Sequence, residues 1–311
     1  LNNIIIVGGG TSGLISALIL RKSFPSKKIT LIQSSQKGIV GVGESSTEHL
    51  KDFCDFVGLP LLDFIVHANA TFKDGIYFSG WSESDYTHNL REYWLNNQGA
   101  YYPVFGYVIS SDLGPAYMQP MASLRNELPL DCFNNWNDSP TYQFQFDTFA
   151  LNNYLSTICN QRSIEIVLDD LNNVEHDENG NITCVVSDIR KYCADFFIDC
   201  SGFERFLSKD IPWKSYSEYL PLNSAVTFET EEMEGYSLYT HATARNSGWS
   251  WKIATQKRTG NGYVFSDKFI DEDEVHREME EAYGQELNIS KTFKFDPGRL
   301  ENAWNKNCYS V

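Results

Sequence analysis

Apolar residues near the N-terminus form two short runs separated by a stretch with helical spacing. The first run, NNIIIVGGG (2–10), is β-branched and ends in glycines, and the second is KITLIQ (28–33). Runs of this length and composition are typical of buried parallel strands. Between them, segment 11–24 has apolar residues at helical spacing and is followed by Pro25, which ends a helix. The pattern therefore predicts a βαβ unit.

The rest of the chain alternates between helical and strand-like patterns. Amphipathic spacing predicts helices over 46–59, 146–162 and 271–283. Strands are predicted at 71–81 (a strand pair or a bent strand), 163–168, 171–177, 181–187, 194–202, 306–311 and, as an antiparallel set, within 222–266. Segment 82–142 is irregular and is expected to be an insertion that carries binding residues. The fold class predicted is α/β, with a Rossmann-type parallel sheet and a second, mainly antiparallel layer.

Net charge and the positions of the cysteines and histidines exclude several classes of protein function. The formal net charge of −16 repels phosphate backbones, so no nucleic acid partner is expected. Seven scattered Cys without C-x-x-C, and six His without metal-ligand spacing, favour reduced thiols, no disulfide scaffold and no metal site. No long apolar stretch predicts a membrane span, and the opening strand leaves no room for a signal peptide, so a cytoplasmic location is expected.

The segment GGGTSG (8–13) is a G-x-G-x-x-G motif between a predicted strand and a predicted helix. The first glycine permits a tight turn, the second lets a pyrophosphate approach the backbone, and the third allows the helix to pack closely on the strand. The helix N-terminus then attracts the phosphates. The cofactor-binding residues predicted from this loop are Gly8, Gly10, Thr11, Ser12 and Gly13.

The second strand ends in Gln33, where an acidic residue usually binds the ribose hydroxyls. Gln33 can still hydrogen-bond a hydroxyl, without the charge. A later strand-to-glycine segment, FFIDCSG (196–202), is expected to pack beside the first unit, as in two-domain FAD enzymes. This favours FAD over NAD, and no second site for NAD(P)H is visible.

Further segments match one family in the same order along the chain. They are GVGESS (41–46), FKDGIYFSGW (72–81), NSGWSWKI (246–253), GNGYVFS (260–266) and DPGRLENAWNKNC (296–308). On these segments the chain resembles the flavin-dependent tryptophan halogenases along its whole length. Only the W-x-W pair is diagnostic by itself, and Ala254 stands where the family has Pro.

The resemblance implies an FADH2-dependent halogenase. In such an enzyme reduced FAD and O2 oxidise halide to hypohalous acid, and a lysine delivers the halogen to an electron-rich aromatic substrate. By motif this catalytic lysine is Lys73, although a lysine in a strand is by itself usually a solvated surface charge. A separate flavin reductase would supply FADH2, and a homo-oligomer is left open.

The resemblance also implies cofactor and tunnel residues. The flavin strap (41–46) contributes Gly41, Gly43, Glu44 and Ser45, and Glu44 would hydrogen-bond the flavin, close the loop or lie at the surface. Trp249 and Trp251 are two residues apart, so in a strand their side chains point to the same face. There they would either shield the flavin from the substrate or fill the core. Tyr101, Tyr102 and Pro103 stand where tryptophan halogenases carry Y-H-P, so Tyr102 replaces a His that helps to sandwich the indole. We therefore expect electron-rich aromatics other than free tryptophan to be preferred.

One intertwined domain is expected. Residues 1–78, 143–215 and 290–311 would form the FAD-binding module, and 79–142 and 216–289 the substrate and tunnel region. In the resembled family a strand like 303–311 leads to an E-P-L-E-S segment, which supplies a second flavin contact and the halide site. Residues 1–311 are therefore expected to be incomplete for catalysis. Two alternatives remain: a flavin monooxygenase or reductase on the same fold, separable by products with and without halide, and a non-catalytic FAD-binding fragment, separable by turnover.

Overall fold

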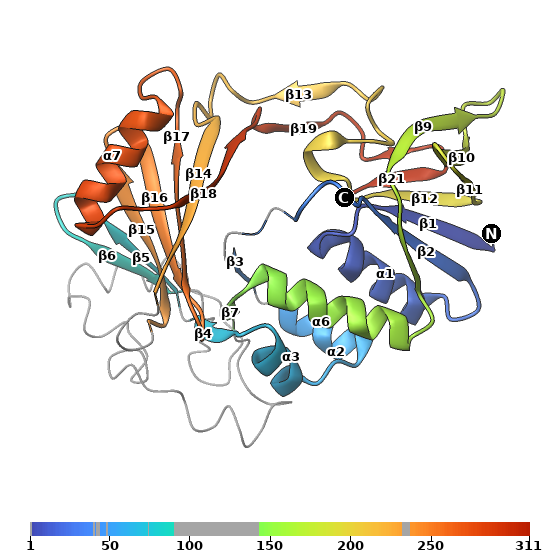
Figure 1. Ribbon diagram of the computed structural model, residues 1–311, viewed down its shortest axis with the longest axis horizontal. Helices are drawn as coiled ribbons and strands as arrows, with labels where there is room; N and C mark the ends of the chain where they lie inside the picture. The colour runs from blue at the N-terminus through green and yellow to red at the C-terminus, as the bar shows by residue number, and fades with distance from the viewer. Residues whose placement is uncertain are drawn as a thin grey trace, which may run out of the picture.

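A six-stranded, mainly parallel sheet and a seven-stranded, mainly antiparallel sheet form the two ends of the structure (Figure 1). The computed structural model describes residues 2–39, 41, 44–47, 49–73, 75–89, 143–231 and 237–311. A small three-stranded sheet lies between the two large ones (Figure 1). The α/β class and its two kinds of sheet are therefore as predicted.

The parallel sheet has β1 at its centre, with β2 on one side and β12 on the other, both parallel to it. The strand order is β20 (Trp304–Asn305), β21 (Cys308–Ser310), β12 (Phe196–Asp199), β1 (Asn3–Val7), β2 (Lys28–Gln33) and β8 (Glu165–Leu168), with only β20 antiparallel to its neighbour. This confirms the βαβ unit and the placing of the late strand beside it. The chain leaves β1 toward β2 and later returns on the other side as β12, and a crevice that binds ligands forms where strand order reverses in this way.

Both faces of the parallel sheet are covered, which is why its strands are continuously apolar. Ile4 and Ile6 pack in the cluster that contains α1, while Ile5 and Val7 pack against the three-stranded sheet on the opposite face. The helices on this side are α1 (Thr11–Ser23), α2 (His49–Val57), α3 (Leu61–His67) and α6 (Thr148–Gln161). The covering sheet is β9 (Leu171–His176), β10 (Ile182–Ser187) and β11 (Lys191–Cys193). Helix α3 was not predicted, because two turns are too short to show a helical period. Among the helices described, none is long and apolar enough to cross a membrane.

A helix lies on the outer face of the antiparallel sheet (Figure 1). The strand order in this sheet is β18 (Ile289–Lys294), β14 (Ser224–Thr230), β17 (Thr259–Phe265), β16 (Gly248–Ala254), β15 (Tyr239–Arg245), β5 (Gly75–Ser79) and β6 (Tyr86–Asn89). The β15–β5 pair is parallel. Helix α7 (Glu272–Tyr283) buries Val275 and Met279 and exposes its acidic side, as predicted. Strands β5 and β18 belong to this sheet, whereas the division made from the sequence put most of both in the FAD-binding module.

The central sheet consists of β3 (Glu44–Ser45), β7 (Gln143–Phe146) and β4 (Thr71–Lys73), with β7 in the middle. The Thr71 hydroxyl donates to the carbonyl of Ala254 on β16 at 2.7 Å, and the Gln145 amide donates to the Ser237 carbonyl at 2.9 Å. One face of the central sheet is therefore turned toward the antiparallel sheet. The remaining elements are β13 (Trp213–Ser215), which pairs with β19 (Gly298–Leu300), and a 3-10 helix (Gly202–Glu204).

The expectation of reduced thiols is wrong for one pair of cysteines. Cys184 and Cys193 form a disulfide. They are nine residues apart, and the register of β10 and β11 places them directly opposite each other with their Cα atoms 4.1 Å apart. Their spacing carries no recognisable motif, because only the register of the hairpin brings them together. The other cysteines within the described residues are free and buried: Cys54, Cys159, Cys200 and Cys308.

Breaking this disulfide should destabilise the protein. Closing a loop of roughly ten residues restricts the unfolded chain, so Cys193→Ser should lower the free energy of unfolding by about 2–3 kcal/mol. Urea unfolding measures the change, and reduced wild-type protein should match the variant. Mass spectrometry after alkylation of the denatured, unreduced protein should find Cys184 and Cys193 unmodified. Full alkylation of both would contradict the disulfide.

Candidate active site

The glycines of the 8–13 loop lie at the crevice where β1 and β12 end. Gly8 has φ +114°, and a β-carbon there would lie 2.2 Å from the carbonyl oxygen of Cys200. A β-carbon on Gly13 would lie 1.9 Å from the carbonyl oxygen of Gly8. A β-carbon on Gly10 would meet no described atom within 4 Å. Packing thus requires glycine at positions 8 and 13, whereas Gly10 borders open space that a phosphate can enter.

The N-terminus of α1 suits an anion. Gly10 is the N-cap residue, no side chain of the described residues caps it, and the first turn contains no acidic residue. The first backbone N–H groups and the helix dipole therefore favour a negative group. Thr11 donates to the side-chain oxygen of Asn152 on α6 at 2.9 Å, which anchors this turn, and Ser12 is exposed beside it.

Gln33 lies at the carboxyl end of β2, as predicted, and is half-buried. Its side chain lies over Gly9, where a β-carbon would come within 2.5 Å of the Gln33 Cγ atom. The amide is therefore held beside the glycine loop, where a ribose hydroxyl would be expected.

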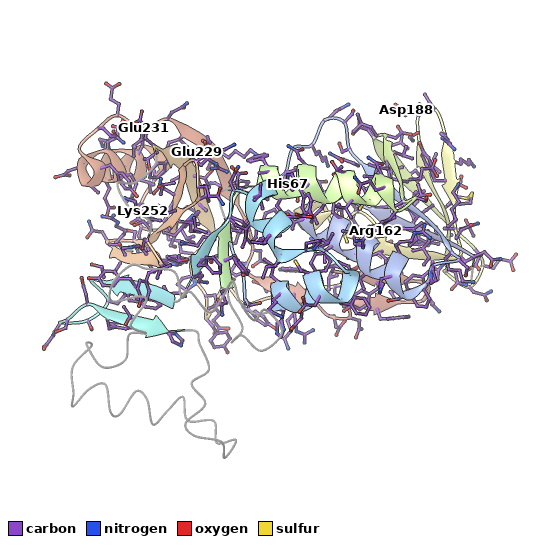
Figure 2. All side chains as sticks on the ribbon, turned by 90° about the horizontal axis from the view of Figure 1, so that it is seen from below. His67, Arg162, Asp188, Glu229, Glu231 and Lys252 are labelled. Atoms are coloured by element: carbon purple, nitrogen blue, oxygen red, sulfur yellow. A yellow bond between two sulfur atoms is a disulfide. The ribbon has the colours of Figure 1, made fainter. Side chains whose placement is uncertain are left out.

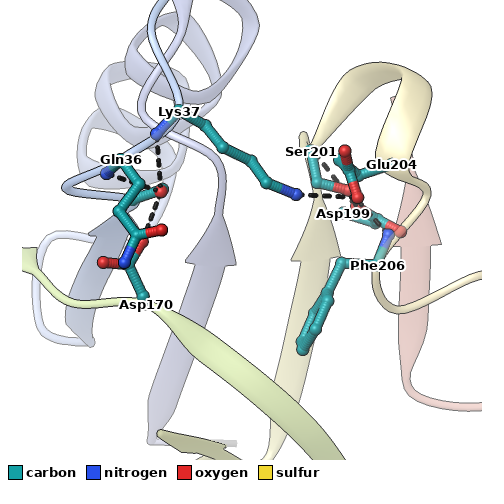
Figure 3. Close-up of polar contacts among 8 residues, drawn as sticks. Gln36, Lys37, Asp170, Asp199, Ser201, Glu204 and Phe206 are labelled. Carbon is teal, nitrogen blue, oxygen red and sulfur yellow. Dashed lines mark hydrogen bonds and ion pairs between the residues drawn. The ribbon is translucent and has the colours of Figure 1, made fainter.

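The loop after β2 is held by residues that the sequence did not single out (Figure 3). Ser34 donates to the carboxylate of Asp170, and the ammonium of Lys37 lies 2.7 Å from Glu204. The Lys37–Glu204 ion pair joins the loops that follow β2 and β12, on either side of the end of β1 (Figure 3). Because both side chains are about half-exposed, the pair contributes at most about 1 kcal/mol.

Gly41, the first strap residue, lies beside the first turn of α6, and Glu44 and Ser45 form β3 of the central sheet. A β-carbon on Gly41 would lie 3.1 Å from the ring of Phe149. Just before the strap, the Lys291 ammonium donates to the carbonyl of Ile39 and lies 5.6 Å from the centre of the Phe149 ring. Contacts from β18 and α6 thus fix the approach to Glu44.

Glu44, on β3, is the strap residue whose side chain can ionise. Burial, reinforced by the nearby charge of Asp147, raises the pKa of Glu44 to about 8, and the positive charge of Arg258 opposes this only in part. The Oε2 atom of Glu44 is buried and has no hydrogen-bond partner among the described residues. Burial therefore favours the neutral form of the Glu44 carboxyl group.

Asp147 and Arg258, which sequence reasoning missed, form a buried ion pair next to Glu44. The Arg258 Nε atom donates to Asp147 Oδ2 at 2.7 Å, and both side chains are almost nine-tenths buried. Arg258 Nη1 also lies 2.7 Å from Glu229, without hydrogen-bond geometry. Burial opposes ionisation of Asp147, but the hydrogen bond from Arg258 brings the pKa of this carboxyl below its ordinary value. The one local signal was that Asp147 lies at the start of the predicted helix 146–162, and in the structure it caps α6.

Lys73, the predicted catalytic residue, lies at the end of β4 and is 6% exposed. Its ammonium donates to the hydroxyl of Ser45 at 3.1 Å and to the carbonyl of Ser46 at 3.3 Å. Lys73 is therefore not a solvated surface charge. The structure brings it together with the predicted strap residue Ser45, from segments 28 residues apart.

Trp249 and Trp251 project from the same face of β16, with their ring centres 5.9 Å apart. Their cross-strand partners include Gly262, which leaves room for the Trp251 ring. Ile253 shares this face, and its cross-strand neighbour Thr240 donates to Gln145 of β7. The tryptophan face is thus turned toward the central sheet that carries Lys73. The buried indole N–H of Trp251 has no partner within the described part of the chain.

Three predicted residues, Gly43, Tyr102 and Pro103, lie outside the described residues. Within the described ranges, no group of three His, Cys, Asp or Glu side chains could hold a metal ion. A surface hollow of about 700 Å³ between α3 and α6 contains none of the predicted site residues. The nucleotide loop and Lys73 are therefore the better candidates for chemistry.

Comparison with known proteins agrees with this arrangement. The sequence profile of the tryptophan halogenases matches residues 3–311. Tryptophan 6-halogenase SttH from Streptomyces toxytricini is 29% identical over all of this chain and 66% of its own length. Tryptophan 7-halogenase RebH from Lentzea aerocolonigenes is 30% identical over all of this chain and 64% of its own length. The chain thus spans just under two thirds of the length of these curated relatives.

Solved structures show the same fold. The crystal structure of SttH superposes with a TM-score of 0.87 at 27% identity, over all of this chain and 67% of that chain. A flavin-dependent halogenase from Xanthomonas campestris superposes with a TM-score of 0.89 at 25% identity, over all of this chain and 65% of that one. Since the profile covers nearly every residue and these folds coincide, the chain belongs to the tryptophan halogenase family.

Proposed function

We propose that the protein is an FADH2-dependent halogenase that uses O2 and halide to form hypohalous acid and halogenates an electron-rich aromatic ring through Lys73. The observation that carries this proposal is the position of Lys73. It is a buried ammonium, hydrogen-bonded to the flavin strap, on the sheet turned toward Trp249 and Trp251. A flavin monooxygenase or reductase has no evident need for such a group.

The residues of the nucleotide loop fit FAD. The space beside Gly10 and the uncapped N-terminus of α1 would hold the diphosphate, and Gln33 would bind the ribose. When bound, the reduced flavin supplies the activation of O2 with which halide is oxidised. The loops joined by Lys37 and Glu204 would flank the adenosine end.

Lys73 would bind and orient the hypohalous acid. An ammonium is a strong donor to the oxygen of this acid, and a lysine held away from water is also a nucleophilic amine. The bonds to Ser45 and Ser46 hold its position on a short strand with little freedom to move. Such positioning lowers the barrier because the reacting groups need not be brought together again in each turnover.

Trp249 and Trp251 would keep the flavin and the aromatic substrate apart, so that only hypohalous acid passes between them. The relatives SttH and RebH are named for tryptophan as substrate. For this chain we propose the broader class of electron-rich aromatics, including indoles. That free tryptophan is not the best of them stays a prediction, because Tyr102 and Pro103 lie outside the described residues.

A separate flavin reductase is the proposed partner, since the chain has a single dinucleotide motif. A cytoplasmic location and a homo-oligomer also remain predictions. The Cys184–Cys193 disulfide argues against the cytoplasmic location, because stable disulfides are uncommon in the cytosol.

Two glycine substitutions should separate cofactor binding from folding. Gly10 has φ −75° and ψ −175°, which any residue adopts, so Gly10→Ala should keep the melting temperature but weaken FAD binding roughly tenfold by filling the phosphate space. Gly13→Ala should lower the stability of the fold itself, by roughly 1–3 kcal/mol, because its β-carbon meets the Gly8 backbone. Flavin fluorescence titration and thermal unfolding measure the two effects. Undiminished FAD affinity in Gly10→Ala would exclude this loop as the site.

Lys73→Met should abolish halogenation while FAD binding is kept. A loss of at least about 100-fold is expected in the rate, because the ammonium acts on the reacting halogen species. Lys252→Met is the matched control. Lys252 (Figure 2) lies on the face of β16 opposite to Trp249 and Trp251, and its ammonium lies over the ring of Tyr283. Product formation is measured by mass spectrometry with the full-length protein. A near-normal rate in Lys73→Met would leave Lys73 with a structural role only.

The need for a reductase and for halide tests the function as a whole. With FAD, NAD(P)H, a flavin reductase, O2, bromide and an activated phenol or indole, the full-length protein should form a brominated product above a free-peroxide control. NAD(P)H without reductase should support no turnover. Hydroxylated product formed equally without bromide would favour the monooxygenase instead.

A further inference from the structure

Glu44 lies near a cluster in which two carboxylates, Asp147 and Glu229, pair with the guanidinium of Arg258. Asp147 follows Phe146, the cross-strand partner of Glu44, and Arg258 reaches both Asp147 and Glu229. Glu229 projects from β14 (Figure 2) and is half-exposed, whereas the side chains of Asp147 and Arg258 are almost nine-tenths buried. The single positive charge of Arg258 is thus already paired, and Glu44 is left with a buried oxygen that has no partner among the described residues.

The charges of this cluster favour a proton on Glu44. Two carboxyl groups close together in a poorly solvated position do not both ionise, and the one with the stronger hydrogen bonds ionises first. Asp147 accepts bonds from Arg258 and from the backbone N–H of Ala150, so Asp147 carries the charge. Among the described residues, Lys73 on β4 also lies beside the strap and donates to the Ser45 hydroxyl and the Ser46 carbonyl, and Lys291 on β18 donates to the Ile39 carbonyl just before it.

We propose that Arg258 and Asp147 are positioning residues that hold Glu44 as a neutral carboxylic acid, and that this acid donates a hydrogen bond to the bound FAD. The inference rests on the proposed function, because it assumes that the strap lies over a flavin. A neutral acid offers an O–H donor that suits the carbonyl and ring-nitrogen acceptors of a flavin. A carboxylate in the same place would lack the donor and would repel an anionic cofactor. FAD affinity must therefore fall as Glu44 loses its proton.

The first test is the dissociation constant of FAD, measured with the full-length protein by fluorescence titration from pH 6 to pH 9.5. If only the protonated form of a group titrating near pH 8 binds tightly, the constant rises about tenfold between pH 7 and pH 9. Glu44→Gln carries a permanently neutral side chain, so its dissociation constant should not change over this range. A wild-type constant that is equally flat would overturn the inference.

Two variants of the ion pair distinguish control of protonation from simple loosening. Arg258→Gln removes a positive charge and should move the midpoint of the pH dependence upward. Asp147→Asn removes a negative charge and should move it downward. Arg258→Lys keeps the charge and should restore the wild-type midpoint. A merely structural ion pair predicts that both charge-removing variants weaken binding at every pH and leave the midpoint unchanged.

Arg162→Gln is the matched control for these variants. Arg162 lies at the other end of α6 and donates to the carbonyls of Val57 and Gly58 (Figure 2). Its loss should affect stability without moving the midpoint. A shift as large as that of Arg258→Gln would mean that α6 transmits a general disturbance, and the inference would fail.

A readout without FAD comes from stability. The folded protein keeps the Glu44 proton up to about pH 8, whereas the unfolded chain releases it near the ordinary value of 4.5, so stability is lost as pH rises between these values. Glu44→Gln lacks this loss, and its advantage in melting temperature over wild type should grow from pH 5 to pH 8. Absence of FAD binding at any pH would count against the proposed function. Tight FAD binding, together with a melting-temperature difference between Glu44→Gln and wild type that does not change with pH, would contradict only the proposed protonation of Glu44.

Discussion

The buried ion pair between Arg258 and Asp147 sets how the two large sheets lie relative to each other. Arg258 comes from the turn between β16 and β17, and Asp147 caps α6 on the side of the parallel sheet. In the same turn, the Gln256 amide donates to the carbonyls of Ile65 and Ala70. A charge taken out of water is costly unless it is paired, and removing one partner of such a pair costs about 3–5 kcal/mol. The turn is therefore held in one docking position.

Strand β7 connects this docked turn to the candidate catalytic residues. It pairs with β3 on one side and β4 on the other, so that Glu44 and Lys73 share one rigid neighbour. The strand then runs directly into Asp147. A group that must meet a small reactive acid has to be placed to within a fraction of an ångström. A lysine on a strand between two sheets meets this requirement better than one on a loop.

The local chemistry of several elements could be read from the sequence. The residues Ile4 to Val7 are apolar on both faces of the strand, and only a covered parallel sheet satisfies that pattern. The glycines of the 8–13 loop follow from the need for close backbone approach, and α7 follows from its amphipathic spacing. The resemblance to the halogenases pointed to Lys73 and to the strap. In each case the determining residues are neighbours in the chain.

Tertiary structure alone decided the contacts between distant segments. Arg258 and Asp147 are 111 residues apart, and neither belongs to a motif. The Cys184–Cys193 bond depends on the register of a hairpin, and the membership of β5 and β18 in the antiparallel sheet depends on pairing with strands far along the chain. The burial of Lys73 and the raised pKa of Glu44 likewise depend on which surfaces cover these side chains. A sequence specifies the local preference of each residue, but the solvation of a charge is determined by everything that packs around it.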